Sequence, residues 1–228
     1  MLNWAVRYYP IVRILESEGL LKKGSLLEIG SGPIGIGLFR KVPFIGCDLS
    51  FGFEPKPPMF PMKASATELP FGNHIFDAVL SSDVLEHVPP ALRTQVVTEA
   101  LRVSKRLAIF AFPCGEAAWE SDRELRDYYR KSNLAVPEWL EEHMLAPFPG
   151  PEIFAGVTGW TVEQIGNDNL QFHAWMMRKE LSRVFCLASS AGIRLAPRLV
   201  ESTLKRADRS PYYRQIFVLR KHHNSAGA

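Results

Sequence analysis

A glycine-rich segment near the N-terminus constrains the fold of this chain more than any other feature. Residues 26–37 read LLEIGSGPIGIG, an apolar run that leads directly into Gly30, Gly32 and Gly35. Glycines at this spacing let a chain turn sharply after a buried strand, and they let a ligand approach the backbone closely. A helix that begins after such a turn presents free N–H groups at its N-terminus. The segment therefore predicts the first strand, turn and helix of a ligand-binding α/β fold.

Apolar runs and helical patterns alternate along the chain as far as residue 112. This alternation predicts right-handed crossovers and a doubly wound, Rossmann-like sheet. Helical spacing of apolar residues over 3–20 predicts a helix before the sheet, and residues 91–104 show the same spacing between two strands. Seven strands are predicted, the last of them antiparallel to its neighbour, at residues 25–29, 42–47, 59–62, 74–81, 107–112, 193–200 and 212–220.

The alternation of strand and helix patterns ends between residues 115 and 175. The segment is rich in Trp, Pro, Glu and Gly, and it shows helical patterns at 122–131 and 138–144 but no clear strand. We interpret it as an α-helical cap inserted into the domain, followed by a longer helix at 171–191. The predicted organisation is a single domain over residues 1–228, with an N-terminal helical region at 1–23 and the cap at 115–175.

The composition is that of a globular protein. Hydrophobic residues make up 46% of the 228, and the net charge of +3 is too small to predict binding to nucleic acid. No apolar run approaches the roughly 20 residues of a membrane-spanning helix. The N-terminus also lacks the layout of a signal peptide, so we expect a cytoplasmic protein. Cys47, Cys114 and Cys186 stand far apart and indicate neither a disulfide framework nor a metal site.

Two acidic residues bear on the ligand that the glycine turn would bind. Asp48 ends the second predicted strand, where a carboxylate can accept hydrogen bonds from both ribose hydroxyls of an adenosine. The glycine spacing and Asp48 alone would equally suit an NAD(P)-dependent oxidoreductase. Glu28, however, lies two residues before the first glycine, where a carboxylate would repel a pyrophosphate and attract a cationic ligand. The charge therefore favours a cofactor that carries an amino group and a sulfonium.

Two blocks of sequence resemble a known family. Residues 26–32 resemble the first motif of class I S-adenosylmethionine-dependent methyltransferases. Residues 64–90, ASATELPFGNHIFDAVLSSDVLEHVPP, resemble the type 11 methyltransferases related to those of ubiquinone and menaquinone biosynthesis. The resemblance covers about residues 24–112, and residues 212–221 show a weaker resemblance to the family's last strand. It implies S-adenosylmethionine as cofactor, S-adenosylhomocysteine as product, and a small molecule or a lipid- or sugar-linked intermediate as acceptor.

The resemblance also implies a set of site residues. Glycines and a serine of the turn would surround the methionine part of the cofactor, Glu28 would reach its ammonium group through water, Asp48 would hold the ribose and Leu49 would flank the adenine. Ser65 stands where the family has an adenine-binding aspartate, so this contact would be uncharged. The implied cofactor-binding residues are Glu28, Gly30, Ser31, Gly32, Asp48, Leu49, Ser65, Ala66, Ser81 and Ser82.

His87 is the candidate for chemistry on the acceptor. The resemblance places it at the mouth of the site, and its reference pKa near neutrality suits a general base for a hydroxyl acceptor or a substrate contact. A non-catalytic domain that binds S-adenosylmethionine is an alternative, because Ser65 departs from the family and no base is unmistakable. The sequence Ser-Ser-Asp at 81–83 differs from the motif of enzymes that methylate amino groups in DNA, which disfavours nucleic acid as substrate.

Overall fold

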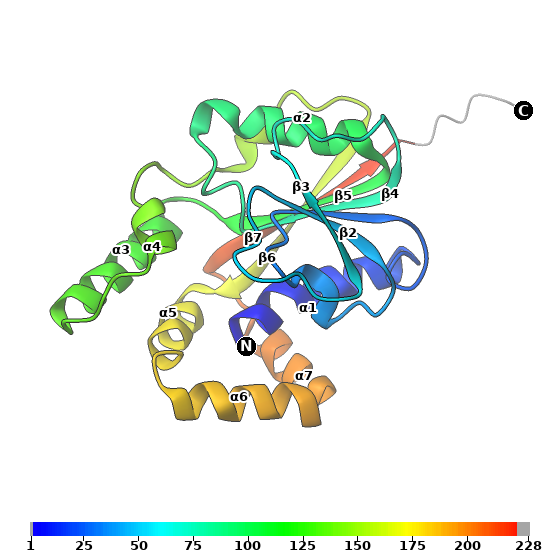
Figure 1. Cartoon of the computed structure of the whole chain (residues 1–228). Coiled ribbons are helices and arrows are strands. Elements are labelled where there is room, and N and C mark those ends of the chain that lie inside the picture. Colours follow the sequence, from blue (N-terminus) through cyan, green and yellow to red (C-terminus); the bar gives the residue numbers. More distant parts are fainter. Residues whose placement is uncertain (1, 223–228) are drawn as a thin grey trace, which may run out of the picture.

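A computed structural model describes residues 2–222 and shows a mixed sheet flanked by helices (Figure 1). The sheet has seven strands in the order β3-β2-β1-β4-β5-β7-β6. Strands β1 to β5 are parallel, and β7 is antiparallel to both β5 and β6. The predicted doubly wound sheet with an antiparallel last strand is confirmed. The strands are β1 (Leu26–Ile29), β2 (Phe44–Asp48), β3 (Met59–Lys63), β4 (Phe76–Ser82), β5 (Ser104–Pro113), β6 (Trp160–Asn169) and β7 (Tyr212–Lys221).

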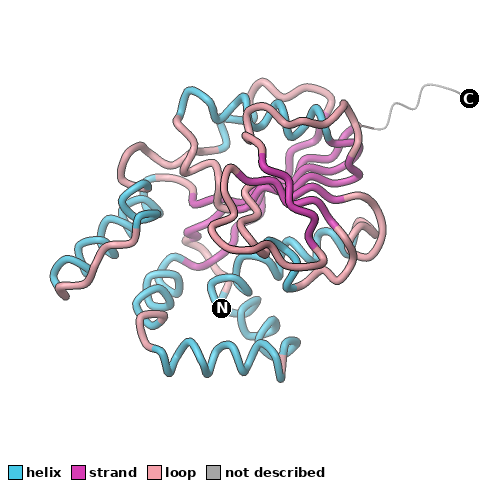
Figure 2. Tube along the Cα trace, in the orientation of Figure 1, coloured by secondary structure: helices cyan, strands magenta, loops and turns pink. Residues whose placement is uncertain are grey.

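Helices cover both faces of the sheet (Figure 2). Helix α2 packs on one face and α1 packs on the other (Figure 1). Helices α6 and α7 pack against α1, while α3 and α4 project from one end. The helices are α1 (Leu2–Ser17), α2 (Arg93–Val103), α3 (Glu116–Lys131), α4 (Glu138–Glu142), α5 (Leu170–Lys179), α6 (Arg183–Leu195) and α7 (Pro197–Ala207). None of the helices within residues 2–222 has the length and apolar character needed to cross a bilayer.

The alternation of side chains along each strand builds two cores. Leu27 and Val79 point to the face covered by α2, where they join Val96. Leu26 and Leu80, each one position away, point to the opposite face and join the buried side of α1. This is the period of two expected of strands buried on both faces. The result is a rigid central sheet whose loop ends are free to form a site.

The structure corrects two predicted strands. Residues 115–175 were expected to hold no strand, which is wrong, because β6 occupies 160–169. It pairs only with β7, and edge strands of this kind carry exposed polar residues that hide the apolar signal. The strand expected at 193–200 is also wrong, because those residues end α6 and begin α7. Pro197 stands in the first turn of α7, where a missing N–H costs nothing.

Two helix predictions also need correction. The helix expected at 171–191 is divided into α5 and α6, because the Ser182 side chain caps α6 by accepting a hydrogen bond from Phe185 N–H. The helix expected directly after the glycine turn is only a four-residue 3-10 helix at Gly35–Leu38. The Ile36 N–H of this short helix donates to the Glu28 carboxylate and is therefore not free for a ligand.

Candidate functional site

A cleft of about 380 Å³ opens at the carboxyl ends of β1, β2 and β4. From β1 the chain adds β2 and β3 on one side of the sheet, and it then returns to add β4 and β5 on the other side. Ligands of doubly wound sheets bind at this switch point, between β1 and β4. Its volume lies in the range of small-molecule sites. Among the residues that line it are Gly30, Asp48, Leu49, Ser65, Ala66, Asp83 and His87. The sheet therefore brings five of the implied cofactor-binding residues together, along with the candidate base.

Asp48 connects the glycine turn to the end of β2. Its Oδ2 accepts a hydrogen bond from Gly32 N–H at 2.9 Å, and its Oδ1 accepts one from Ser50 N–H at 3.2 Å. These bonds fix the carboxylate on the wall of the cleft. Each carboxylate oxygen can accept a second hydrogen bond, so Asp48 retains capacity for ligand hydroxyls.

Glu28 lies behind the glycine turn, and it is not among the cleft-lining residues. Its side chain is buried, with one oxygen accepting from the Tyr8 hydroxyl and the other from Ile36 N–H, both at 2.6 Å. A Cβ on Gly35 would collide with this carboxylate, which explains the glycine there. Burial raises the pKa of Glu28 to about 7, although the hydrogen bonds from Tyr8 and Ile36 oppose the rise. In this structure Glu28 braces the turn through contacts with protein groups.

The other implied residues divide between the wall of the cleft and the layer behind it. The side chains of Ser31, Ser81 and Ser82 are buried and do not line the cleft. Ser65 does line it, and its hydroxyl shares a hydrogen bond with Thr67 Oγ1 at 2.7 Å. Ser65 therefore shapes the turn after β3 while facing the region where the family resemblance implies an adenine.

A second cavity, of about 430 Å³, lies next to the cleft. Asp83 and His87 line both spaces. Its other walls come from α1, the α3–α4 region, α5 and β7, with Arg7, Tyr129, Trp139, His143, His173 and Arg214 among the lining residues. The helices after β5 and the N-terminal helix thus enclose a polar, aromatic chamber beside the cleft.

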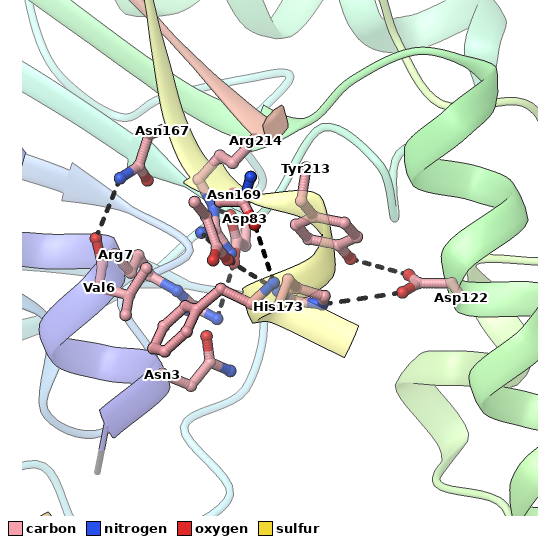
Figure 3. A network of polar contacts seen from close by, with 12 residues as sticks. Asn3, Val6, Arg7, Asp83, Asp122, Asn167, Asn169, His173, Tyr213 and Arg214 are labelled. Carbon is pink, nitrogen blue, oxygen red and sulfur yellow. Dashed lines mark hydrogen bonds and ion pairs between the residues drawn. The ribbon is translucent and has the colours of Figure 1, made fainter. Parts of the chain in front are cut away.

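A buried ion pair forms the floor of this second cavity (Figure 3). The Arg214 guanidinium donates to both oxygens of Asp83, at 2.7 and 2.8 Å, and to Asp168 at 3.2 Å. Arg7 of α1 reaches the same Asp83 at 2.7 Å. Burial alone would raise the pKa of Asp83, but the charges of Arg214 and Arg7 outweigh it and hold that pKa well below its usual range. Asp83 also has φ of 52°, a conformation that is strained for a non-glycine residue and is typical of functional sites.

The network continues through histidines toward the cap (Figure 3). His173 Nδ1 lies 2.7 Å from Asp168, and the Tyr213 hydroxyl donates to Asp122 at 2.8 Å. Asp122 is fully buried and also contacts His143 Nδ1 at 2.6 Å. Sequence reasoning found none of these carboxylates, because strands β6 and β7 and helix α3 bring them together from distant parts of the chain.

His87 stands at the boundary between the two cavities, and both of its ring nitrogens have protein partners. Nδ1 lies 2.7 Å from a Glu142 oxygen, and Nε2 lies 3.3 Å from Nε2 of His143. Burial and the neighbouring His143 lower the pKa of His87, against the attraction of Glu142. Its position suits contact with an acceptor, and its Nε2, the nitrogen that Glu142 does not hold, lies against His143.

Residues 39–112 match the family model of a methyltransferase domain. These residues run from the end of the 3-10 helix to β5 and contain Asp48, Ser65, Asp83 and His87. The matched segment belongs to a methyltransferase domain. Such a domain uses S-adenosylmethionine as its methyl donor, so the protein is an enzyme that transfers methyl groups.

Solved structures of methyltransferases share this fold at low sequence identity. A putative sarcosine dimethylglycine methyltransferase from Galdieria sulphuraria superposes with a TM-score of 0.55 at 15% identity, covering 92% of this chain and 84% of that one. Magnesium protoporphyrin IX methyltransferase from Synechocystis PCC 6803, with bound SAH, gives 0.50 at 13% identity, covering 93% and 81%. No curated protein sequence matches the chain. The methyltransferase domain therefore rests on the family match, and the structural likeness shows the fold.

Gly30 and Gly32 provide a matched test of the turn. Both have positive φ, but a Cβ on Gly30 would collide with Val84, whereas one on Gly32 would meet open space. We expect Gly32→Ala to lower the free energy of unfolding by about 1–2 kcal/mol, the cost of left-handed backbone. Gly30→Ala should lower it by roughly 1–3 kcal/mol more, through overpacking. Urea denaturation measures both, and equal losses would contradict the packing assigned to Gly30.

The raised pKa of Glu28 predicts a pH-dependent stability. Between its ordinary value of 4.5 and about 7, the folded protein holds a proton here that the unfolded chain releases. This contribution to stability is therefore complete below pH 4.5 and is lost as the pH rises through 7. Relative to Glu28→Gln, the free energy of unfolding of the unaltered protein should fall by about 3 kcal/mol across that window. A difference between the two proteins that stays constant with pH would show that Glu28 is ionised throughout.

Proposed function

We propose that this protein transfers a methyl group from S-adenosylmethionine, bound in the cleft, to a small acceptor bound in the adjoining cavity. The observation that carries the proposal is that the two spaces share a wall at Asp83 and His87. A methyltransferase must hold donor and acceptor on opposite sides of one reacting carbon, and two joined cavities provide that arrangement.

The residues of the cleft fit the parts of the cofactor. Asp48 has acceptor capacity for ribose hydroxyls, and Leu49 and Ala66 offer apolar contacts for an adenine beside Ser65. At the other end of the cleft, Gly30 leaves room for close approach to the backbone, and Asp83 lies on the wall that the cleft shares with the second cavity. Glu28 would act on the cofactor by bracing the turn, since its two oxygens already bind Tyr8 and Ile36.

The second cavity favours a small polar acceptor. Its volume of about 430 Å³ suits a small molecule or the reactive end of a lipid- or sugar-linked intermediate. Arg7 and Arg214 are occupied by Asp83, so the floor is already neutralised and does not itself demand an anionic acceptor. Tyr129 and Trp139 provide apolar and aromatic surface on the cap side. Oxygen, nitrogen and carbon acceptors are all compatible with these walls.

Catalysis by the chain would consist mainly of alignment. When bound, S-adenosylmethionine supplies a methyl group on a positively charged sulfur, which an aligned nucleophile displaces in line. The cleft residues would fix the donor, and the chamber beneath the cap would exclude water and orient the acceptor. His87 would contact the acceptor at the boundary. We expect the helical cap assigned to residues 115–175 to contribute α3 and α4 to this chamber.

The direct test is binding of the cofactor by isothermal titration calorimetry. We expect S-adenosylmethionine and S-adenosylhomocysteine to bind the purified protein, and NADH and NADPH not to bind. Asp48→Asn should weaken binding about 10–100-fold, since hydrogen bonds to a charged group contribute about 1.5–3 kcal/mol. Glu54→Gln is the matched control, because Glu54 is an exposed acid six residues away that does not line the cleft.

Two results would contradict the proposal. The first is heat from NADH binding with none from S-adenosylmethionine, which would favour an oxidoreductase. The second is binding without turnover, in which incubation with fractionated cell extract yields no S-adenosylhomocysteine above that formed by Asp48→Asn. That outcome would leave a cofactor-binding domain without catalysis.

A further inference from the structure

Three potential metal ligands meet on the wall shared by the two cavities. Glu86, His87 and His143 each offer one donor atom, and these atoms all lie within 4.8 Å of one another. Glu86 and His87 follow β4, whereas His143 follows α4 in the cap. All three residues line the second cavity, so a ligand there could reach an ion held among them.

The Glu86 carboxyl group is buried and lacks a polar partner among the described residues. Its side chain is buried, with 4% of the residue exposed, and neither carboxylate oxygen has a hydrogen-bond partner among the described residues. An unpaired buried carboxylate is costly, and such groups in native proteins are normally paired or bound to metal. Three guanidiniums act on Glu86 without a direct hydrogen bond to it. Arg7 and Arg214 are bound to Asp83, and Arg93 donates to the backbone carbonyls of Val88 and Pro147.

The two histidines are oriented as metal ligands are. His143 Nδ1 lies 2.6 Å from Asp122, and His87 Nδ1 lies 2.7 Å from Glu142. A carboxylate at Nδ1 fixes the proton on that nitrogen and leaves Nε2 with a free lone pair, the arrangement seen in carboxylate–histidine–metal sites. Both Nε2 atoms then face each other at 3.3 Å with lone pairs opposed. This separation matches two nitrogen ligands at about 2.0–2.1 Å from one tetrahedral ion.

We propose that Glu86, His87 and His143 form a site for a divalent transition metal ion at the boundary between cofactor and acceptor. Two imidazoles and one carboxylate suit Zn²⁺ or Fe²⁺ better than Mg²⁺, which prefers oxygen ligands. Three protein ligands leave at least one coordination position open, as in catalytic sites. That position faces the second cavity, because all three ligands line it. The site accounts for the occupied nitrogens of His87, which acts as a ligand here and not as a free base.

The metal would determine which class of acceptor binds. This inference about the acceptor rests on the proposed methyl transfer. A hydroxyl oxygen bound to the ion loses its proton to solvent more readily, because the ion lowers its pKa. The oxygen then forms a C–O bond to the methyl carbon as the C–S bond breaks, and the electron pair of that bond stays on sulfur as a neutral thioether. The acceptors we infer are therefore small molecules with a metal-binding hydroxyl, such as an enol, phenol or vicinal diol.

Cobalt binding to the chain of 228 residues tests the site without any acceptor. We expect one equivalent of Co²⁺ to give visible d–d absorption of a four- or five-coordinate ion, which one equivalent of Zn²⁺ removes and excess Mg²⁺ does not. Glu86→Gln and His143→Ala should each weaken Zn²⁺ binding more than 100-fold. Glu142→Gln, which removes only the orienting carboxylate, should weaken it about 10–100-fold.

Controls separate this site from adventitious binding and from misfolding. His74→Ala should bind Co²⁺ unchanged, because His74 lies near Lys221 and away from the cluster. Binding of S-adenosylmethionine to each variant reports whether the cleft is intact. Absence of the cobalt spectrum, or an equal spectrum in His143→Ala, would overturn the site and leave a simple hydrogen bond between the two histidines. Metal binding without S-adenosylmethionine binding would instead refute the proposed function while the metal site stood.

Discussion

The contact between Arg214 and Asp83 is the interaction on which the rest of the site depends. A buried guanidinium is stable only when it is neutralised and fully hydrogen-bonded, and here two carboxylates from different strands supply this. Asp83 follows β4, Asp168 lies in β6 and Arg214 lies in β7, so one charged group ties three strands together at one end of the sheet. Arg7 adds the N-terminal helix to the same contact. Removing Asp83 would take this carboxylate from both Arg214 and Arg7 and leave Arg214 with Asp168 alone.

This ionic floor explains why an active site can form where it does. The switch point between β1 and β4 opens a cleft in any doubly wound sheet, but the cleft alone holds only one of two reactants. In this protein the antiparallel β7 and the edge strand β6 extend the sheet past β5, and Tyr213 and Arg214 of β7 line a second space against α1 and the cap. The proposed site therefore lies between the parallel strands and the segments that follow β5.

The sequence predicted the common part of the fold well because the signals there are local. The apolar runs of β1 to β5 are buried on both faces, and the glycine turn needs particular residues at particular positions. Asp48 was expected in the cleft from its position at the end of β2, and Leu49, Ser65 and Ala66 were expected there from the family resemblance. The secondary structure after β5 was harder to predict. β6 is an edge strand with a polar exposed surface, and the apolar residues around Pro197 belong to the start of a helix and not to a strand.

The polar network could not have been predicted from spacing. His143 follows His87 by 56 residues, a separation that matches no metal motif, and only the packing of α4 against the loop after β4 brings them together. The protein contacts of Glu28 could not be predicted either. Its charge next to the glycines indicated a cationic ligand, and only the structure shows that both of its oxygens accept hydrogen bonds from protein groups, Tyr8 of the preceding helix and Ile36.

The account depends most on the claim that the cleft and the second cavity are two halves of one active site. A crystal structure of the protein with S-adenosylhomocysteine tests this most directly. We expect the ribose at Asp48 and the sulfur directed at the shared wall, with Asp83 and His87 as its nearest charged and titratable neighbours and a clear path into the second cavity. A ligand whose sulfur faces away from that wall, or one bound elsewhere on the molecule, would contradict the account.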